Sequence, residues 1–143
     1  MAKYIAKVKP IFVNFSAFAF HRHALHYYKC VQDFRSPDPW SPVPYALLCR
    51  AIELELKARH LAITPGQPGV RKYGHNLERA YEALPTNQKI LTVAERAALR
   101  KANKVYNDDK GFDYIQPVDA AHGYRRFVDL GSLDALAKKL LAI

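Results

Sequence analysis

Arg71 and His75 have the residue types that phosphate chemistry would need. They stand four positions apart in a segment rich in Pro and Gly, so helical geometry does not fix their separation. A histidine can carry a proton to or from a reacting oxygen, and a permanently charged arginine can stabilise a crowded phosphate. Arg71 and His75 are therefore the candidate catalytic pair. The alternative is a structural His75 that bonds amides or a carboxylate at the start of a helix.

Glu53 and Lys57 form a second polar group of interest. They are spaced i and i+4 on a predicted helix, with the carboxylate first, which is the favourable order for an ion pair. His75 and Asn76 open the next predicted helix. We expect Glu53, Lys57 and Asn76 to form a polar cluster beside His75, and we favour a structural role for it over a catalytic one.

Basic residues outnumber acidic ones by 22 to 13, which gives a net charge of +9. This excess favours a polyanionic partner such as RNA, DNA or an acidic protein, and a solubilising surface is the alternative. Like charges at every fourth position of a helix repel one another, and a phosphate backbone would relieve that repulsion. The candidate nucleic-acid-binding residues are Arg96, Arg100, Lys101, Lys104, Arg125 and Arg126, with Tyr106 and Tyr124 as possible stacking surfaces.

The sequence predicts neither a metal site nor a cofactor site. His21, His23 and His26 lie close together, but on a helix the first two point about 200° apart, so the three rings cannot converge on one ion. Cys30 and Cys49 lack metal-like spacing, which favours a reduced, cytoplasmic protein. No run approaches the ~18 apolar residues that span a membrane, so we expect no membrane partner.

Apolar periodicity predicts an all-α protein, and the length suits a single domain over residues 1–143. Helices are predicted over residues 15–34, Tyr45–Ile63, His75–Leu84 and Thr92–Tyr106, followed by a last helix that is capped by Ser132 and presents apolar residues to Leu141. Thr92 and Glu95 have the spacing of a capping box. The helix Tyr45–Ile63 carries two apolar stripes, so it should lie centrally, with neighbours on both sides that could include a second subunit.

Three segments are predicted to connect these helices. The Pro-rich residues 35–44 form a loop from which Trp40 should pack back onto the domain. Thr64–Gly74 is a flexible connector by its Pro and Gly content. Residues 107–123 form a long loop, in which residues 112–115 should lie as an extended piece on the core.

The segments Ala51–Leu61 and Gly74–Leu84 carry a further signal. An apolar helix with Glu and Lys one turn apart, a loop, and then Gly-His-Asn-Leu opening a second helix resembles the HEPN domain family. The resemblance covers residues 43–84. It implies an up-and-down bundle of about five helices with a long loop between the last two. It also implies a cytoplasmic homodimer that acts in a toxin–antitoxin or defence module.

Catalytic members of that family carry an Arg followed, after four to six residues, by a His that meets its copy across a dimer and cleaves RNA. No Arg in this chain has that spacing, because Arg71 and His75 have only three residues between them. We therefore expect a divergent, non-catalytic HEPN-like protein that binds nucleic acid or a partner such as a cognate antitoxin-like protein. Two alternatives stay open. One is a metal-independent endoribonuclease that uses Arg71 and His75, and the other is a structural interaction domain that binds an acidic protein.

Overall fold

The computed structural model of the protein describes residues 16–65 and 71–143, and every regular element in those ranges is a helix. The α-helices are α1 (Ala17–Asp33), α2 (Val43–Ile63), α4 (Leu77–Glu82), α5 (Val93–Asn103), α6 (Pro117–Ala121) and α7 (Leu130–Leu141). A 3₁₀ turn, η1, covers Thr86–Gln88, and a π-helical turn, η2, covers Lys104–Asp108. The predicted all-α class is confirmed for the described ranges. None of their helices is both long enough and apolar enough to cross a bilayer.

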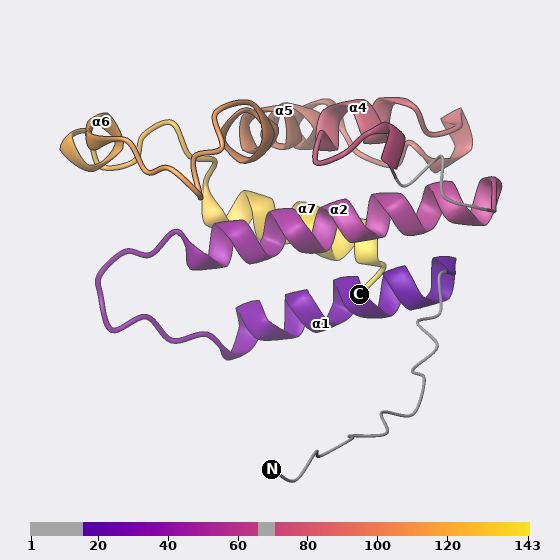
Figure 1. Ribbon diagram of the computed structural model, residues 1–143, viewed down its shortest axis with the longest axis horizontal. Helices are drawn as coiled ribbons and strands as arrows, with labels where there is room; N and C mark the ends of the chain where they lie inside the picture. The colour runs from indigo at the N-terminus through magenta and orange to yellow at the C-terminus, as the bar shows by residue number, and fades with distance from the viewer. Residues whose placement is uncertain (1–15, 66–70) are drawn as a thin grey trace, which may run out of the picture.

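The helices pack in three layers (Figure 1). Helices α1 and α2 form a long hairpin, α7 lies beside α2, and α4 and α5 cover the side of α2 away from α1. The short helix α6 lies at one end of the molecule, beyond the main stack. Both sides of α2 are therefore covered by helices of the same chain.

Helix α2 is the centre of the core, as its two apolar stripes predict. Its buried apolar residues are Leu48, Cys49, Ala51, Ile52, Leu54, Leu56, Ala58 and Leu61. They point toward α1 on one side and toward α4 and α7 on the other. A helix covered on two sides leaves little room for polar side chains, yet α2 also buries Glu53 and Glu55. Those two carboxylates must find partners on the neighbouring elements.

Helices α1 and α2 agree closely with the predicted ranges. The Ser16 hydroxyl caps α1 by accepting a hydrogen bond from the Ala19 amide at 3.1 Å. Helix α2 begins two residues earlier than predicted, at Val43, because Pro44 is compatible with the first turn of a helix. Trp40, in the loop between them, stacks on Tyr124 with ring centroids 3.4 Å apart, so the prediction that it packs back is confirmed.

Helix α4 is shorter than predicted. It begins at Leu77 instead of His75, because the Asn76 side chain accepts a hydrogen bond from the Arg79 amide and so caps the helix. Gly74, with φ of +53°, turns the chain just before it. His75 consequently lies outside the helix, on the turn that leads into it.

Helix α5 begins as predicted and ends early. Thr92 and Glu95 form both hydrogen bonds of a capping box. The α-helical hydrogen bonding stops at Asn103, and the chain continues as the π-helical turn η2. Asn103 is buried, and its side-chain oxygen accepts a hydrogen bond from the Leu77 amide at 2.7 Å, which ties α5 to the start of α4.

The last part of the chain differs from prediction in three respects. Residues 107–123 contain α6, which starts at Pro117, a residue suited to the first turn. Helix α7 is capped by Asp129, whose carboxylate accepts the Ser132 amide at 2.9 Å, so Ser132 lies inside the helix. Of the piece predicted to lie on the core, residues 112–115, Phe112 packs against the core, but the prediction is wrong for Tyr114 and Ile115, which are exposed.

Candidate functional site

Glu53 is the centre of the most elaborate polar arrangement among the described residues. It lies midway along α2 and is only 2% exposed. Its Oε1 accepts hydrogen bonds from Arg50 at 2.8 Å and from Lys57. Its Oε2 accepts hydrogen bonds from His75 Nδ1 at 3.0 Å and from the Tyr106 hydroxyl at 2.5 Å. Four donors thus satisfy one buried carboxylate, as its burial requires.

The hydrogen bonds that Glu53 accepts favour the ionised form of its carboxylate. Burial alone would raise the pKa of Glu53, but the hydrogen bonds from Lys57, Tyr106 and His75 outweigh it and lower the pKa below the usual range. Burial and the negative charge of Glu53 raise the pKa of Tyr106, so its hydroxyl stays protonated and donates. Burial lowers the pKa of Arg50, but attraction to Glu53 outweighs that effect and raises it.

The cluster holds more positive than negative charge. Arg50 and Lys57 are two cations bonded to one anion, and His75 would add a third cation if it took up a proton. Lys57 is 13% exposed, so water screens it little. An anion that approached from the open side would meet a net positive group.

His75 faces that open side. An ionised carboxylate only accepts hydrogen bonds, so the contact with Glu53 places the proton of a neutral His75 on Nδ1. The other ring nitrogen, Nε2, bonds no other described residue and is free to accept a hydrogen bond or a proton. The side chain is 65% exposed, so solvent and ligands can reach it.

Tyr106 reaches the cluster because of the π-helical turn. In η2 the Asp109 amide bonds the Lys104 carbonyl five residues earlier, which re-aims the intervening side chains. Just after it, the Gly111 amide bonds the Val105 carbonyl at 2.7 Å. A Cβ at Gly111 would lie 2.8 Å from a Val105 methyl carbon, so only glycine fits this close approach.

Arg126 fixes the end of the same turn. Its guanidinium donates to Asp109 at 2.5 Å and makes two hydrogen bonds to Asp119. Asp119 is buried, and its bonds from Arg126 hold its pKa below the usual range. Arg126, a candidate nucleic-acid-binding residue by sequence, is therefore engaged in an internal ion-pair network.

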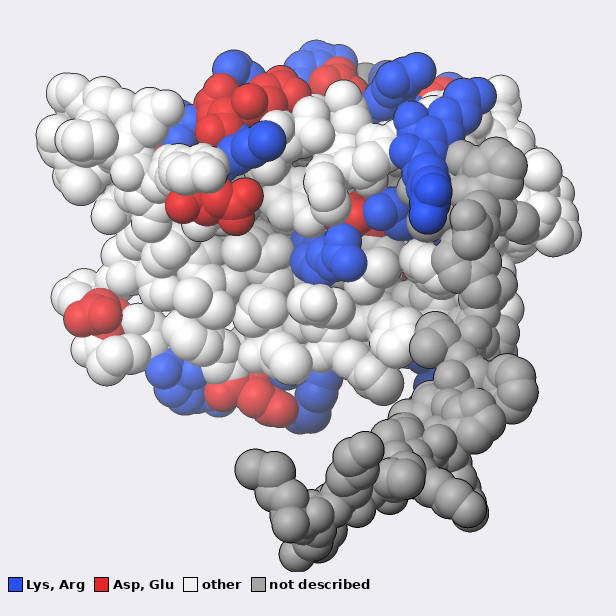
Figure 2. All heavy atoms as spheres, viewed as in Figure 1, with Lys and Arg blue, Asp and Glu red and all other residues white. Residues whose placement is uncertain are grey.

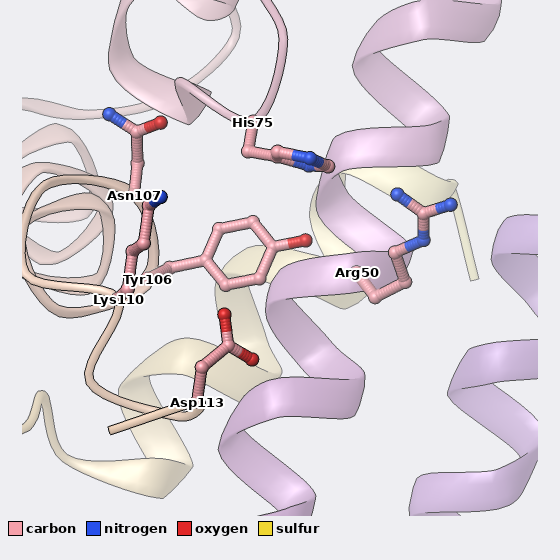
Figure 3. Close-up of a pocket in the computed structure, with 6 residues that line it drawn as sticks. All are labelled: Arg50, His75, Tyr106, Asn107, Lys110 and Asp113. Atoms are coloured by element: carbon pink, nitrogen blue, oxygen red, sulfur yellow. The ribbon is translucent and has the colours of Figure 1, made fainter. Parts of the chain in front are cut away.

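A pocket of about 470 Å³ opens beside the cluster (Figure 3). It is lined by Arg50, His75, Tyr106, Asn107, Lys110 and Asp113. The Tyr106 hydroxyl points between His75 and Arg50, while Asp113 approaches Tyr106 from the side opposite His75 (Figure 3). Lys110 and Asp113 are exposed and form no ion pair with any described residue.

Glu55, on another side of α2, is a second buried carboxylate that accepts hydrogen bonds from basic side chains. It is 6% exposed and accepts hydrogen bonds from His21 Nδ1 at 2.6 Å and from Arg59 at 3.2 Å. Arg59 also donates to the Leu140 carbonyl at 2.7 Å. This second cluster ties α1 and α7 to α2, and neither Glu55 nor His21 lines the pocket beside Glu53. His21 therefore provides an internal comparison for His75.

The structure brings together some of the residues that the sequence singled out. Glu53 and Lys57 contact each other, and His75 joins them through the carboxylate. Asn76 is placed differently, since its side chain caps α4. Arg71 is exposed, and among the described residues its side chain has no hydrogen bond or ion pair.

The basic row on α5 and the first residue of η2 is interleaved with acidic residues (Figure 2). Its ion pairs are Arg96 with Glu82 at 3.7 Å, Arg100 with Glu78 at 2.6 Å, and Lys104 with Asp109 at 2.8 Å. Lys101 and Arg125 are exposed and have no ion pair with a described residue. The repulsion expected along the row is thus relieved largely by neighbouring carboxylates of the same chain.

Sequence reasoning missed Arg50, Lys110 and Asp113 as site residues, and it gave Tyr106 a different role. Arg50 had a signal, since it stands three residues before Glu53 on the same polar strip. Lys110 and Asp113 lie in a segment predicted as loop, where no periodicity indicates which way a side chain points.

Comparison of the chain with protein-family models, curated proteins and solved structures finds no match. Its function must therefore be inferred from the chemistry of the site.

Proposed function

We propose that this chain is a divergent HEPN-like helical protein that binds RNA, and that the pocket beside Glu53 receives a phosphate of the strand. The observation that carries the proposal is that Arg50, His75 and Lys110 all line one open pocket. The predicted homodimer and the toxin–antitoxin or defence setting belong to the same proposal.

The pocket has the donors that a phosphate needs. Arg50 is held by Glu53 and remains charged, and its side chain is 36% exposed. Lys110 adds a cation that no described carboxylate neutralises. His75, oriented through Nδ1, can donate from Nε2 once protonated. Because Glu53 fixes Arg50 and His75 beforehand, a phosphate would not have to order those two side chains.

Lys110→Gln tests the proposal by fluorescence anisotropy of a labelled single-stranded RNA. Loss of one phosphate contact should reduce affinity several-fold at low salt and make the slope of log K against log[salt] shallower by about 0.7. The control is Lys29→Gln, which removes the same charge from an exposed residue of α1 that pairs with Asp33 and does not line the pocket. The control should retain nearly all of the wild-type affinity and slope.

Equal losses in the two variants would mean that RNA binds by overall charge, without the pocket. An absence of RNA binding by the wild-type chain would contradict the proposal and favour the alternative of an acidic protein partner.

A second candidate function, a metal-independent endoribonuclease, is favoured by one specific observation. His75 is oriented by a buried carboxylate through Nδ1 and has Nε2 free, as a general base requires. Nε2 would take the proton of a ribose 2′-hydroxyl as its oxygen bonds to phosphorus and the phosphorus–O5′ bond breaks, with water protonating the leaving oxygen. The structure offers Arg50, in place of Arg71, to stabilise the phosphate.

An RNA cleavage assay in EDTA tests this second candidate. Cleavage by wild type that falls at least about 100-fold in His75→Gln, but not in His21→Gln, would support it. His21 bonds the buried Glu55 as His75 bonds Glu53, so it controls for loss of a structural ion pair. Equal activity of wild type and His75→Gln would exclude His75 from the chemistry.

A further inference from the structure

Asp113 is the residue of the pocket that phosphate binding does not explain. Its carboxylate points toward the Tyr106 ring (Figure 3). It makes no hydrogen bond or ion pair with a described residue, although Lys110 lines the same pocket. A free carboxylate repels phosphate, so in a phosphate-only site its presence would be a cost. A group on the ligand that donates hydrogen bonds to the Asp113 carboxylate would offset that cost.

An ionised carboxylate has two acceptor oxygens and no donor. It is therefore best matched by two adjacent N–H groups, which bind it in parallel. Among the RNA bases only guanine presents two adjacent donors, N1–H and N2–H, on its Watson–Crick edge. Adenine and cytosine place one amino group beside a ring nitrogen acceptor, and uracil places one N–H between two carbonyls. Those acceptors would face the carboxylate and repel it.

The pocket has room for a base as well as a phosphate. Its volume of about 470 Å³ lies within the range of roughly 300–1,000 Å³ that small-molecule sites occupy. Arg50 and Asp113 approach it from different elements, α2 and the loop after η2, and in Figure 3 the Tyr106 side chain lies between His75 and Asp113. A nucleotide could thus direct its phosphate to the cations and its base edge to the carboxylate.

We propose that the pocket is selective for guanine nucleotides, with Asp113 accepting N1–H and N2–H of the base while Arg50, His75 and Lys110 hold the phosphate. This inference rests on the proposed function, because it assigns the base that accompanies the bound phosphate.

Isothermal titration calorimetry with GMP, IMP, AMP and ribose 5-phosphate tests the selectivity on the wild-type chain. GMP should bind about tenfold or more tightly than AMP. IMP, which lacks the N2 amino group but keeps N1–H, should bind with intermediate affinity. Equal affinity for GMP and AMP would overturn the guanine assignment and leave the phosphate site standing. An absence of binding by all four ligands would contradict the phosphate site as well.

Asp113→Asn gives a second test in which two effects have opposite signs. The variant should lose GMP affinity about tenfold, because a carboxamide has one acceptor oxygen in place of two. It should bind ribose 5-phosphate as well as wild type or better, since it removes a negative charge from the pocket. Asp38→Asn removes another exposed charge, from the loop between α1 and α2, and should change neither affinity. Equal losses for GMP and ribose 5-phosphate in Asp113→Asn would overturn base recognition.

Competition with short RNAs separates a free nucleotide from a strand. An oligouridine with one central guanine should displace GMP better than its all-uridine counterpart if the pocket reads guanine within RNA. If GTP and GMP compete for the pocket but neither RNA does, the pocket recognises guanine in a free nucleotide instead of in a strand. Displacement by both RNAs to the same extent would overturn the role of the base.

Discussion

Replacing Glu53 with Gln removes the charge on which four donors converge. The carboxamide keeps the shape of the side chain but has one acceptor oxygen and an NH₂ group that would face other donors. Arg50 and His75 are exposed enough for water to replace the lost partner. The cost therefore comes from Lys57 and from Tyr106, which stay largely enclosed. One charged and one neutral hydrogen bond lost in this setting lower the free energy of unfolding by about 3 kcal/mol.

Urea denaturation followed by far-UV circular dichroism measures this loss. Glu53→Gln should lower the midpoint at an unchanged m-value. Glu78→Gln, which removes an exposed partner of Arg100, should cost less than about 1 kcal/mol. In a double-mutant cycle, Tyr106→Phe should add less in the Glu53→Gln background than in wild type, because the two residues share one hydrogen bond. A Glu53→Gln chain within about 0.5 kcal/mol of wild type would refute the reasoning that this carboxylate is buried and bonded.

Two further predictions follow from the same geometry. The pKa of Glu53 is lowered by folding, so its contribution to stability is present above the unfolded pKa of about 4.3 and is lost as pH falls through the folded pKa. Acid titration of stability should therefore be shallower in Glu53→Gln than in wild type, and identical curves would contradict the shift. Gly111→Ala should destabilise the chain by about 1–3 kcal/mol and weaken RNA binding, because its Cβ would lie 2.8 Å from a Val105 methyl carbon and displace η2. An unchanged urea midpoint and unchanged RNA affinity would contradict this tight fit.

Most of the fold could be predicted from local sequence patterns. Residues 15–34 and Tyr45–Ile63 were predicted within about two residues of the observed ends, because apolar periodicity and flanking prolines mark them clearly. Errors arose where two capping residues compete. Asn76 and Asp129 each cap a helix through a side-chain oxygen that accepts the amide three residues on. Choosing among such candidates requires the path of the preceding chain.

The site could be predicted only where its members share a helix or adjoin one. Glu53 and Lys57 are one turn apart, and His75 opens the next predicted helix, so their proximity followed from sequence. Tyr106 could not be placed, since the switch from α to π hydrogen bonding after Asn103 has no sequence signature in this chain. The ion pairs of Arg96 and Arg100 could not be predicted from the sequence either, because their acidic partners on α4 come close only through tertiary packing.

The most direct test of RNA binding at this pocket is the imidazole NMR spectrum during an RNA titration. With ¹⁵N-labelled protein, the Nε2 resonance of His75 should shift saturably, with the dissociation constant that anisotropy gives for the same RNA. The resonances of His21, whose Nδ1 is held by Glu55, should stay in place. Saturable RNA binding that leaves the His75 ring unshifted would contradict the account, because the strand would then lie elsewhere on the molecule.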